Sequence, residues 1–128
     1  MKKVLLIDDE KDFCFCTKEA LELTGSYKVF VANDGKKGMH AARWHGPDLI
    51  LLDLVMPGID GVEALERLKA EEKTRSIPVV ILTALYNEGS KARTADLGAV
   101  DYIVKPVDMD VLDSRIRKAL KAGSINGR

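Results

Sequence analysis

Long apolar runs are absent from this sequence. No stretch approaches the ~20 consecutive apolar residues of a membrane-spanning helix. The apolar run near the N-terminus covers only Val4–Ile7, and carboxylates follow it at once, which does not fit a secretory signal peptide. We therefore expect a cytoplasmic protein with no membrane partner.

An excess of charge of one sign is lacking as well. The 128 residues carry 20 Lys and Arg against 20 Asp and Glu. A chain with balanced charges has no general attraction to nucleic acid or to anionic lipid. We therefore expect no direct contact with nucleic acid, and any effect on DNA would require another domain or a partner.

Cysteine is scarce, with only Cys14 and Cys16 in the chain. Two residues apart, their side chains point to different faces of a strand or a helical turn and cannot easily form a disulfide. No neighbouring His or Cys suggests a metal site around them. We expect ordinary thiols in a reducing compartment.

What the sequence does contain is a repeat of short apolar runs, in a chain whose length suits one domain. The runs are Val4–Ile7, Val29–Ala32, Leu49–Leu52, Val79–Leu82 and Val100–Val104. Four of them are nearly continuous in Val, Ile and Leu, which is typical of strands buried on both faces of a parallel sheet. The stretch Tyr27–Ala32 alternates less cleanly and includes Lys28, which indicates an edge strand.

The stretches between these runs have the period of amphipathic helices. The first carries its apolar or small residues at Phe13, Cys16, Thr17, Ala20 and Leu21, followed by Gly25. Further helices are predicted from Asp34 to about Arg43, around Val62–Leu68, from about Glu88 to Leu97 and from Asp108 to about Lys121. Five βα units predict an α/β fold with a doubly wound parallel sheet and helices on both faces. We expect this domain to span residues 1–122, followed by a flexible tail at 123–128.

Polar residues of particular interest fall where the predicted strands end. Asp8 and Asp9 follow the first strand, Asp53 the third, Thr83 the fourth and Lys105 the fifth. Taken singly, such an Asp is usually a helix cap, such a Thr a local hydrogen-bonder and such a Lys-Pro a turn. Those explanations do not account for the whole set at one edge of the sheet, in phase with the βα repeat. In open α/β sheets that edge carries the ligand crevice.

The charges at this edge predict a cation. Three carboxylates (Asp8, Asp9 and Asp53) and the Lys105 ammonium sum to about −2, and crowded carboxylates repel so strongly that one would normally stay protonated. A divalent cation removes the conflict. Oxygen ligands without His or Cys favour Mg²⁺ over zinc, and Mg²⁺ also binds phosphate oxygens. The site therefore suits Mg²⁺ together with a phosphoryl group.

These residues also match a known family. Asp8-Asp9, Asp53 within the segment Leu52–Gly61, Thr83-Ala84 and Lys105-Pro106 resemble the receiver domain of bacterial response regulators in two-component signal transduction, chemotaxis regulators among them. The resemblance runs from Lys3 to about Lys121. It implies a flavodoxin-like fold with strand order 2-1-3-4-5, and a phosphoacceptor rather than an enzyme that turns over a separate substrate.

The resemblance also implies roles for single residues. Asp53 would take a phosphoryl group from a sensor histidine kinase or a phosphotransfer protein. Asp9, Asp53 and the backbone carbonyl of Val55 would bind Mg²⁺ directly, with Asp8 acting mainly through a metal-bound water. Lys105 would neutralise phosphoryl oxygens, and the Lys105-Pro106 bond would be cis.

A switch and its partners follow from the same resemblance. Thr83 would move its hydroxyl onto the phosphoryl group, and Tyr102 would follow by turning inward. The altered face would then bind a downstream effector, or a second copy in a phosphorylation-dependent dimer. An alternative for Tyr102 is a plain core aromatic.

Some features are particular to this chain. Val55 and Leu85 occupy the two positions that tune phosphoryl lifetime in the family, two residues past Asp53 and Thr83. Neither side chain can hold an attacking water, which predicts slow self-dephosphorylation. Phe15 lies outside the predicted apolar stripe, either as part of a kinase-docking patch or tucked under a neighbouring loop.

Two competing functions make different demands on the sequence. A phosphatase of the haloacid dehalogenase type also uses an Asp nucleophile and Mg²⁺, but it places an Asp-x-Asp motif after the first strand and often has an inserted cap domain. Here Asp8 and Asp9 are adjacent and the chain has no room for a cap. A degenerate receiver used only for interaction would lack one of the key residues, and all are present.

Overall fold

A computed structural model describes the backbone of residues 1–126 and side chains through residue 122. Strands and helices alternate along the chain in five βα units, as predicted. In order these are β1 (Lys2–Ile7), α1 (Lys11–Leu23), β2 (Tyr27–Ala32), α2 (Gly35–His45), β3 (Leu49–Leu52), α3 (Gly61–Ala70), β4 (Val79–Thr83), α4 (Glu88–Asp96), β5 (Asp101–Val104) and α5 (Met109–Asn126). Within the described residues, none of these helices has the length and apolar character needed to cross a membrane.

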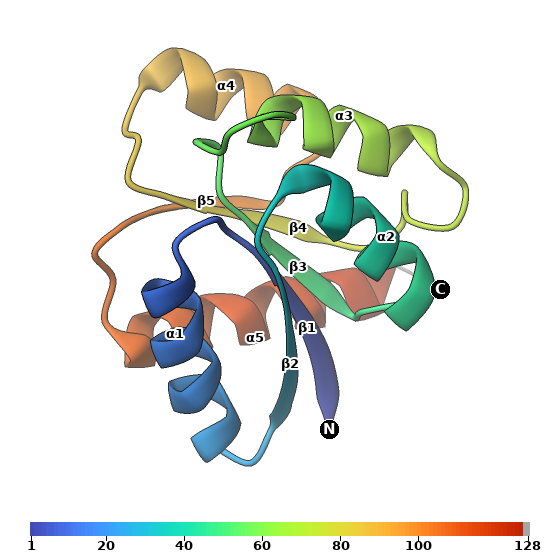
Figure 1. Cartoon of the computed structure of the whole chain (residues 1–128). Helices are drawn as coiled ribbons and strands as arrows, with labels where there is room; N and C mark the ends of the chain where they lie inside the picture. Colours follow the sequence, from blue (N-terminus) through green and yellow to red (C-terminus); the bar gives the residue numbers. More distant parts are fainter. Residues whose placement is uncertain (127–128) are drawn as a thin grey trace.

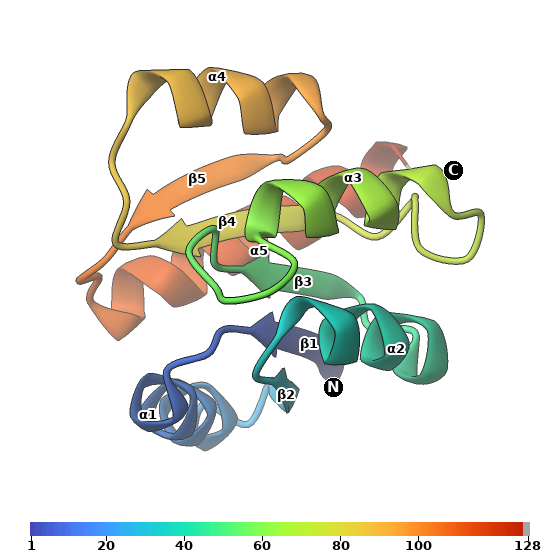
Figure 2. The same cartoon turned by 45° about the horizontal axis from the view of Figure 1, so that its top comes forward.

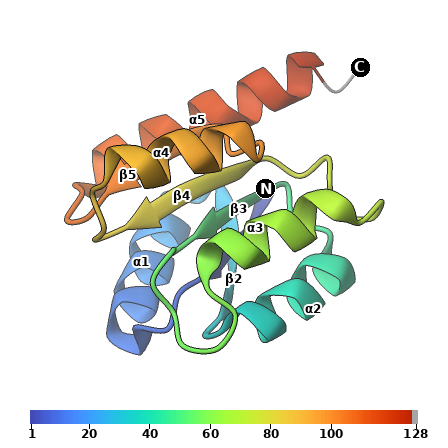
Figure 3. The same cartoon turned by 90° about the horizontal axis from the view of Figure 1, so that it is seen from above.

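The five strands form one parallel sheet in the order β2-β1-β3-β4-β5, which confirms the predicted order and the edge position of β2. Helices α1 and α5 cover one face of the sheet, and α2, α3 and α4 cover the other (Figure 1). Figures 2 and 3 show the same two helical layers from other directions. Because the chain returns to the same edge after every helix, all five strands point the same way.

Alternation of side chains along each central strand divides the core into two parts. Toward α2 and α3 lie Leu5, Ile7, Ile50, Leu52, Val79 and Ile81. Toward α1 and α5 lie Val4, Leu6, Leu49, Leu51, Val80 and Leu82. Both faces of β1, β3 and β4 are therefore buried, which explains why these runs are almost purely aliphatic.

The buried face of α1 agrees with the predicted one at Phe13, Thr17 and Leu21, but Cys14 takes the place of Cys16. The helix buries Cys14, Thr17 and Leu21, whereas Cys16 is exposed. The helix begins at Lys11, and the spacing of Cys14, Thr17 and Leu21 fits a helical period as well as the predicted stripe does. Both cysteines are free, as expected.

Helix ends confirm several predicted boundaries and correct two. The Asp34 carboxylate accepts a hydrogen bond from the Lys37 N–H at 2.7 Å and caps α2, but α2 continues to His45, past the predicted end near Arg43. Helix α5 continues to Asn126, beyond the predicted end near Lys121. The predicted tail at 123–128 therefore starts inside this helix, and residues 127–128 lie outside the described residues.

The outer edge of β2 is protected by side chains of α1. The Val29 N–H donates to the Glu22 carboxylate at 2.9 Å, and the Val29 carbonyl accepts from the Lys18 ammonium at 2.8 Å. Glu22 and Lys18 also form an ion pair of 2.8 Å. The Lys18 ammonium and the Val29 N–H lower the pKa of Glu22. An edge strand with unpaired backbone groups invites pairing with another chain, and here α1 occupies those groups at Val29.

We predict that Glu22→Ala destabilises the protein by about 1 kcal/mol, because it removes a charged partner from the Val29 N–H and from Lys18. Urea unfolding at pH 7 measures this loss. A lowered carboxyl pKa adds stability that is present above the ordinary Glu range and is lost as pH falls through the folded-state value. The difference between wild type and variant should therefore shrink on acidification.

The matched control is Glu19→Ala, on an exposed position of the same helix. It makes the same chemical change, and we expect its stability to stay within about 0.5 kcal/mol of wild type. Equal losses in the two variants would contradict the edge-protection argument.

Candidate functional site

The carboxyl ends of four strands bring the predicted site residues together. The Asp53 N–H donates to the Ile7 carbonyl at 3.0 Å, which places Asp53 beside the end of β1. The Lys105 N–H donates to the Thr83 carbonyl at 2.8 Å, which joins the ends of β4 and β5. The predicted convergence at one edge of the sheet is therefore observed.

Three carboxylates form the centre of this site. Asp8, Asp9 and Asp53 each offer an oxygen, and these oxygens lie within 4.8 Å of one another. Asp8 and Asp53 are buried, and Asp9 is exposed. Burial raises the pKa of Asp8 and the Asp53 charge adds to the rise, although hydrogen bonds from Lys105 and the Glu10 N–H oppose it. A cluster of oxygen donors with uncompensated negative charge fits a hard divalent cation such as Mg²⁺.

Lys105 lies beside this cluster, between two carboxylates and an aromatic ring. Its ammonium is 2.7 Å from the Asp8 carboxylate and 2.9 Å from the Glu10 carboxylate. The ring of Phe13 faces it, with 4.0 Å between the ammonium nitrogen and the ring centroid. Burial pulls the pKa of Lys105 down, but the hydrogen bonds to Asp8 and Glu10 outweigh it, so the net pKa is raised. The Lys105-Pro106 bond is cis, as expected.

The backbone of Asp8 is anchored by residues that sequence reasoning missed. Its carbonyl accepts from the Asn33 side-chain amide at 2.9 Å and from the Cys14 thiol at 3.4 Å. Burial raises the pKa of Cys14 to about 12, so the thiol keeps its proton and can donate. Asn33 directly follows β2, and its place after a predicted strand was the one signal that could have drawn attention to it.

Gly61 allows α3 to approach Asp53 closely. A Cβ atom at this position would lie 2.3 Å from the Asp53 carbonyl oxygen and 2.5 Å from the Leu54 Cα. No side chain fits there, because both neighbours are backbone atoms. The turn before α3 uses Gly58 at φ +77°, and Asp60 caps α3 through the Glu63 N–H at 2.9 Å.

Thr83 and Tyr102 are linked through the backbone of one residue, Leu85. The Leu85 N–H donates to the Thr83 hydroxyl oxygen at 3.3 Å, and the Leu85 carbonyl accepts from the Tyr102 hydroxyl at 2.6 Å. Thr83 is buried, whereas Tyr102 is half-buried with its hydroxyl at the surface. Tyr102 therefore packs partly against the core, while its hydroxyl reaches the surface.

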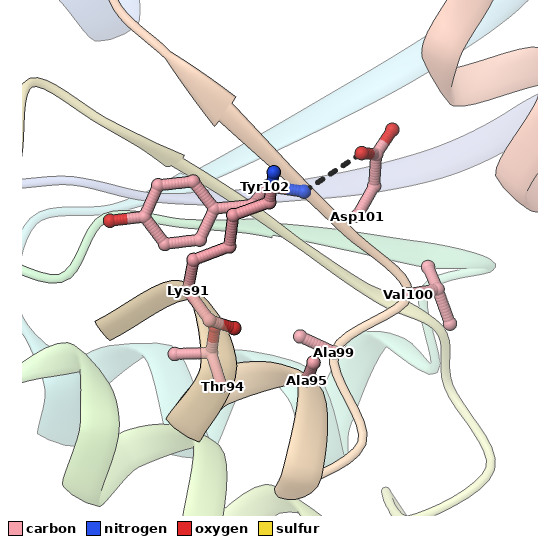
Figure 4. Close-up of a pocket in the computed structure, with 7 residues that line it drawn as sticks. All are labelled: Lys91, Thr94, Ala95, Ala99, Val100, Asp101 and Tyr102. Carbon is pink, nitrogen blue, oxygen red and sulfur yellow. Dashed lines mark hydrogen bonds between the residues drawn. The ribbon is translucent and has the colours of Figure 1, made fainter. Parts of the chain in front are cut away.

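Tyr102 also borders a groove between α4 and β5. In Figure 4 its ring lies above α4, from which Lys91 reaches up alongside it. The groove has a volume of about 220 Å³ and is lined by Lys91, Thr94, Ala95, Ala99, Val100, Asp101 and Tyr102. A second hollow of about 410 Å³ lies on the other side of β5, lined by Val100, Asp101, Arg115, Lys118, Ala119 and Ala122. The surface is therefore indented between α4 and β5, beside Tyr102, and again between β5 and α5.

Two exposed side chains concern docking and phosphoryl lifetime. Phe15 on α1 is 65% exposed, so the alternative that it tucks under a loop is wrong.

Val55 is 59% exposed beside Asp53, and its N–H donates to the Asp53 carboxylate at 3.3 Å. The apolar Val55 side chain therefore faces solvent next to the carboxylate.

Comparison with known proteins gives the same family throughout. The family model of the response regulator receiver domain matches residues 4–117. The chain is 40% identical over 121 residues to the DNA-binding dual master transcriptional regulator RpaA of Synechocystis sp., which covers 94% of this chain and 50% of that protein. It is 38% identical over 126 residues to the transcriptional regulatory protein AfsQ1 of Streptomyces coelicolor, with coverages of 96% and 53%. The chain thus spans about half the length of these curated relatives.

Solved structures agree in fold over almost the whole chain. A CheY-like response regulator receiver domain protein from Methanospirillum hungatei JF-1 superimposes with a TM-score of 0.91 at 25% identity, covering 98% of both chains. The receiver domain of the Francisella response regulator 1452 gives 0.85 at 32% identity, covering 95% of this chain and 98% of that one. With its five-stranded fold and its cluster of aspartates at the carboxyl edge, this chain belongs to the response regulator receiver domain family, the phosphoacceptor signalling module of two-component systems.

Proposed function

We propose that this chain is a phosphorylation-dependent switch that accepts a phosphoryl group on Asp53. The observation that carries the proposal is the junction of three carboxylates within 4.8 Å and the Lys105 ammonium, which contacts one of them at 2.7 Å. Phosphoryl transfer passes through a loose transition state, so catalysis consists mostly of positioning and charge neutralisation. This edge of the sheet offers both.

Asp53 acts as the nucleophile in this proposal. One carboxylate oxygen attacks the phosphorus of a phosphohistidine on a histidine kinase or phosphotransfer protein. The P–N bond breaks, its electron pair stays on the imidazole nitrogen, and a new P–O bond joins the phosphoryl group to Asp53. Lys105 stabilises the charge on the phosphoryl oxygens. The group then stays on the chain until water removes it, so no separate substrate is turned over.

The carboxylates fit Mg²⁺ as the cofactor of this transfer. Asp9, Asp53 and the Val55 carbonyl would bind the ion directly, and Asp8 would act through a bound water. When bound, the ion neutralises charge on the phosphoryl oxygens. The protein's own contribution is a buried Asp8 whose raised pKa reflects the unfavourable placement of its charge, which a cation relieves.

Leu85 supplies the link from phosphorylation to the surface. A phosphoryl group adds roughly 1.5–2 negative charges and three strong acceptors. The Thr83 hydroxyl moves to donate to one of them, and so leaves the Leu85 N–H. The Leu85 segment is then free to shift, and the Tyr102 hydroxyl loses the carbonyl that holds it outward. Contacts made in only one state are what shift a two-state equilibrium.

Two surfaces serve the partners in this proposal. The exposed Phe15 on α1 lies on the side that would dock the kinase or phosphotransfer protein. The hollows on either side of β5 would receive a downstream effector or a second copy after phosphorylation. We place the exchange in the cytoplasm, where free thiols such as Cys14 and Cys16 persist. Direct contact with DNA is not part of the proposal, since the charge is balanced.

The first prediction concerns the acceptor. Incubation with acetyl phosphate and Mg²⁺ should add the mass of one phosphoryl group to the wild-type chain, measured by intact-protein mass spectrometry. Asp53→Asn should show no addition, because an amide is not a nucleophile here. Chelation of Mg²⁺ by EDTA should suppress labelling of the wild type. An unlabelled wild-type chain would refute the proposed function, and continuous turnover of a phosphoester would favour a phosphatase.

The second prediction concerns lifetime. Val55→Asn or Leu85→Asn should speed loss of the phosphoryl group by roughly 10-fold, below the ~10²–10⁴ of a full general base, because a polar side chain can hold the attacking water. The measurement is the decay of the labelled chain after the phosphodonor is removed. Val55→Ala is the matched control and should decay like wild type. Unchanged decay in both Asn variants would contradict the prediction.

The third prediction concerns the switch. Thr83→Ala should still be phosphorylated on Asp53. The amide resonances of α4 and β5 should no longer shift on phosphorylation, because the variant lacks the hydroxyl that donates a hydrogen bond to the phosphoryl group. Two-dimensional ¹H–¹⁵N NMR before and after acetyl phosphate measures this, with Thr83→Ser as the control that keeps the hydroxyl. Shifts of wild-type size in Thr83→Ala would rule out the route through Leu85.

A further inference from the structure

The Lys105 ammonium has a second carboxylate partner that belongs to no part of the proposed phosphoacceptor site. Glu10 contacts it at 2.9 Å, and the Glu10 side chain is 62% exposed while that of Lys105 is only 9% exposed. Among the described residues, the Lys105 ammonium forms hydrogen bonds and ion pairs with Asp8 and Glu10 but none with Asp53. Lys105 is therefore held toward α1 in this structure.

The start of α1 builds this holding position. Glu10 is the N-cap residue, directly before α1. Its N–H donates to the Asp8 carboxylate at 2.9 Å, and its carbonyl accepts from the Cys14 N–H at 3.0 Å. The backbone of Glu10 is thus fixed on both sides. Phe13, in the first turn, packs against the core and turns its ring to the Lys105 ammonium.

The hydrogen-bond donors of the Lys105 ammonium determine what it can offer to a phosphoryl group. An ammonium has three N–H donors. Asp8 and Glu10 each engage the Lys105 ammonium as acceptors, and the Phe13 ring lies against it. A ring face attracts a cation but offers no oxygen acceptor. One donor therefore has no oxygen acceptor among the described residues, while the other two hold the ammonium toward Asp8 and Glu10. For the ammonium to move onto a phosphoryl group on Asp53, the exposed contact to Glu10 is the easier one to give up.

We propose that Glu10 and Phe13 are positioning residues that hold Lys105 in a resting place, and that release from Glu10 sets part of the barrier to phosphorylation. The inference rests on the proposed function, because it concerns the lysine that would meet the phosphoryl group. The ion pair with Glu10 restrains the Lys105 ammonium, and the Phe13 ring contacts the ammonium in this position.

The test compares phosphorylation rates with acetyl phosphate and Mg²⁺. Glu10→Gln should raise the rate constant by about two- to five-fold, the range expected when a partly exposed ion pair is removed. Asp12→Asn is the matched control, since it removes one negative charge from the exposed first turn of the same helix. Its rate should stay near that of wild type. An equal gain in Asp12→Asn would show a general charge effect and overturn the inference.

Lys105→Met supplies the second comparison. In this background the added Glu10→Gln change should have no effect, because the residue that Glu10 restrains is gone. A persisting gain would overturn the inference. A wild-type chain that accepts phosphoryl at the same rate as Glu10→Gln would overturn it alone, whereas a wild-type chain that accepts none would refute the proposed function and this inference together.

The resting place itself can be observed without any phosphorylation. Because the Phe13 ring lies 4.0 Å from the ammonium nitrogen, its ring current should shift the ε-methylene protons of Lys105 upfield in NMR spectra. Glu10→Gln should reduce this shift, and Phe13→Leu should abolish it. Lys105 shifts that are unchanged in Glu10→Gln would overturn the proposed hold.

Discussion

The contact between Lys105 and Asp8 is the constraint on which the rest of this site depends. It joins the ends of β5 and β1, two strands with β3 and β4 between them. Both side chains are nearly or fully buried, 9% and 0% exposed. Removing two charges from water costs about as much as their attraction returns, so such a pair is weak evidence for stability. It is better understood as a contact that keeps the Lys105 ammonium next to carboxylates whose total charge it cannot neutralise.

The fold could be predicted because its pattern is redundant. The runs at Leu49–Leu52 and Val79–Leu82 are aliphatic on every residue, which only a strand covered on both faces requires. The set of Asp8, Asp53, Thr83 and Lys105 could be predicted because each residue directly follows an apolar run that predicts a strand. The strand order, in contrast, came from the family resemblance, since five βα units alone are compatible with other orders.

The surroundings of Lys105 could not be predicted, because they depend on the rotation of one helix. Each residue turns an α-helix by about 100°, so the contact of the Phe13 ring with the ammonium depends on how α1 is rotated and placed against the end of β5, which the apolar pattern alone does not give. The role of Leu85 was half predicted. The sequence predicted a role for its apolar side chain, but the link from Thr83 to Tyr102 uses its backbone N–H and carbonyl. Every residue has these backbone groups, so the identity of the residue does not indicate such a link.

The two partners of Lys105 differ in a way that fits a switch. Losing Glu10 would expose a carboxylate that is already 62% exposed to water, which costs little. Losing Asp8 would leave a fully buried charge without its partner, which costs much more. If Asp53 accepts a phosphoryl group as proposed, the added charge would compete first against the contact to Glu10, while the contact to Asp8 persists. In the proposed switch Lys105 would thus pivot about its bond to Asp8, and the carboxyl edge of the sheet would keep the lysine charge in both states.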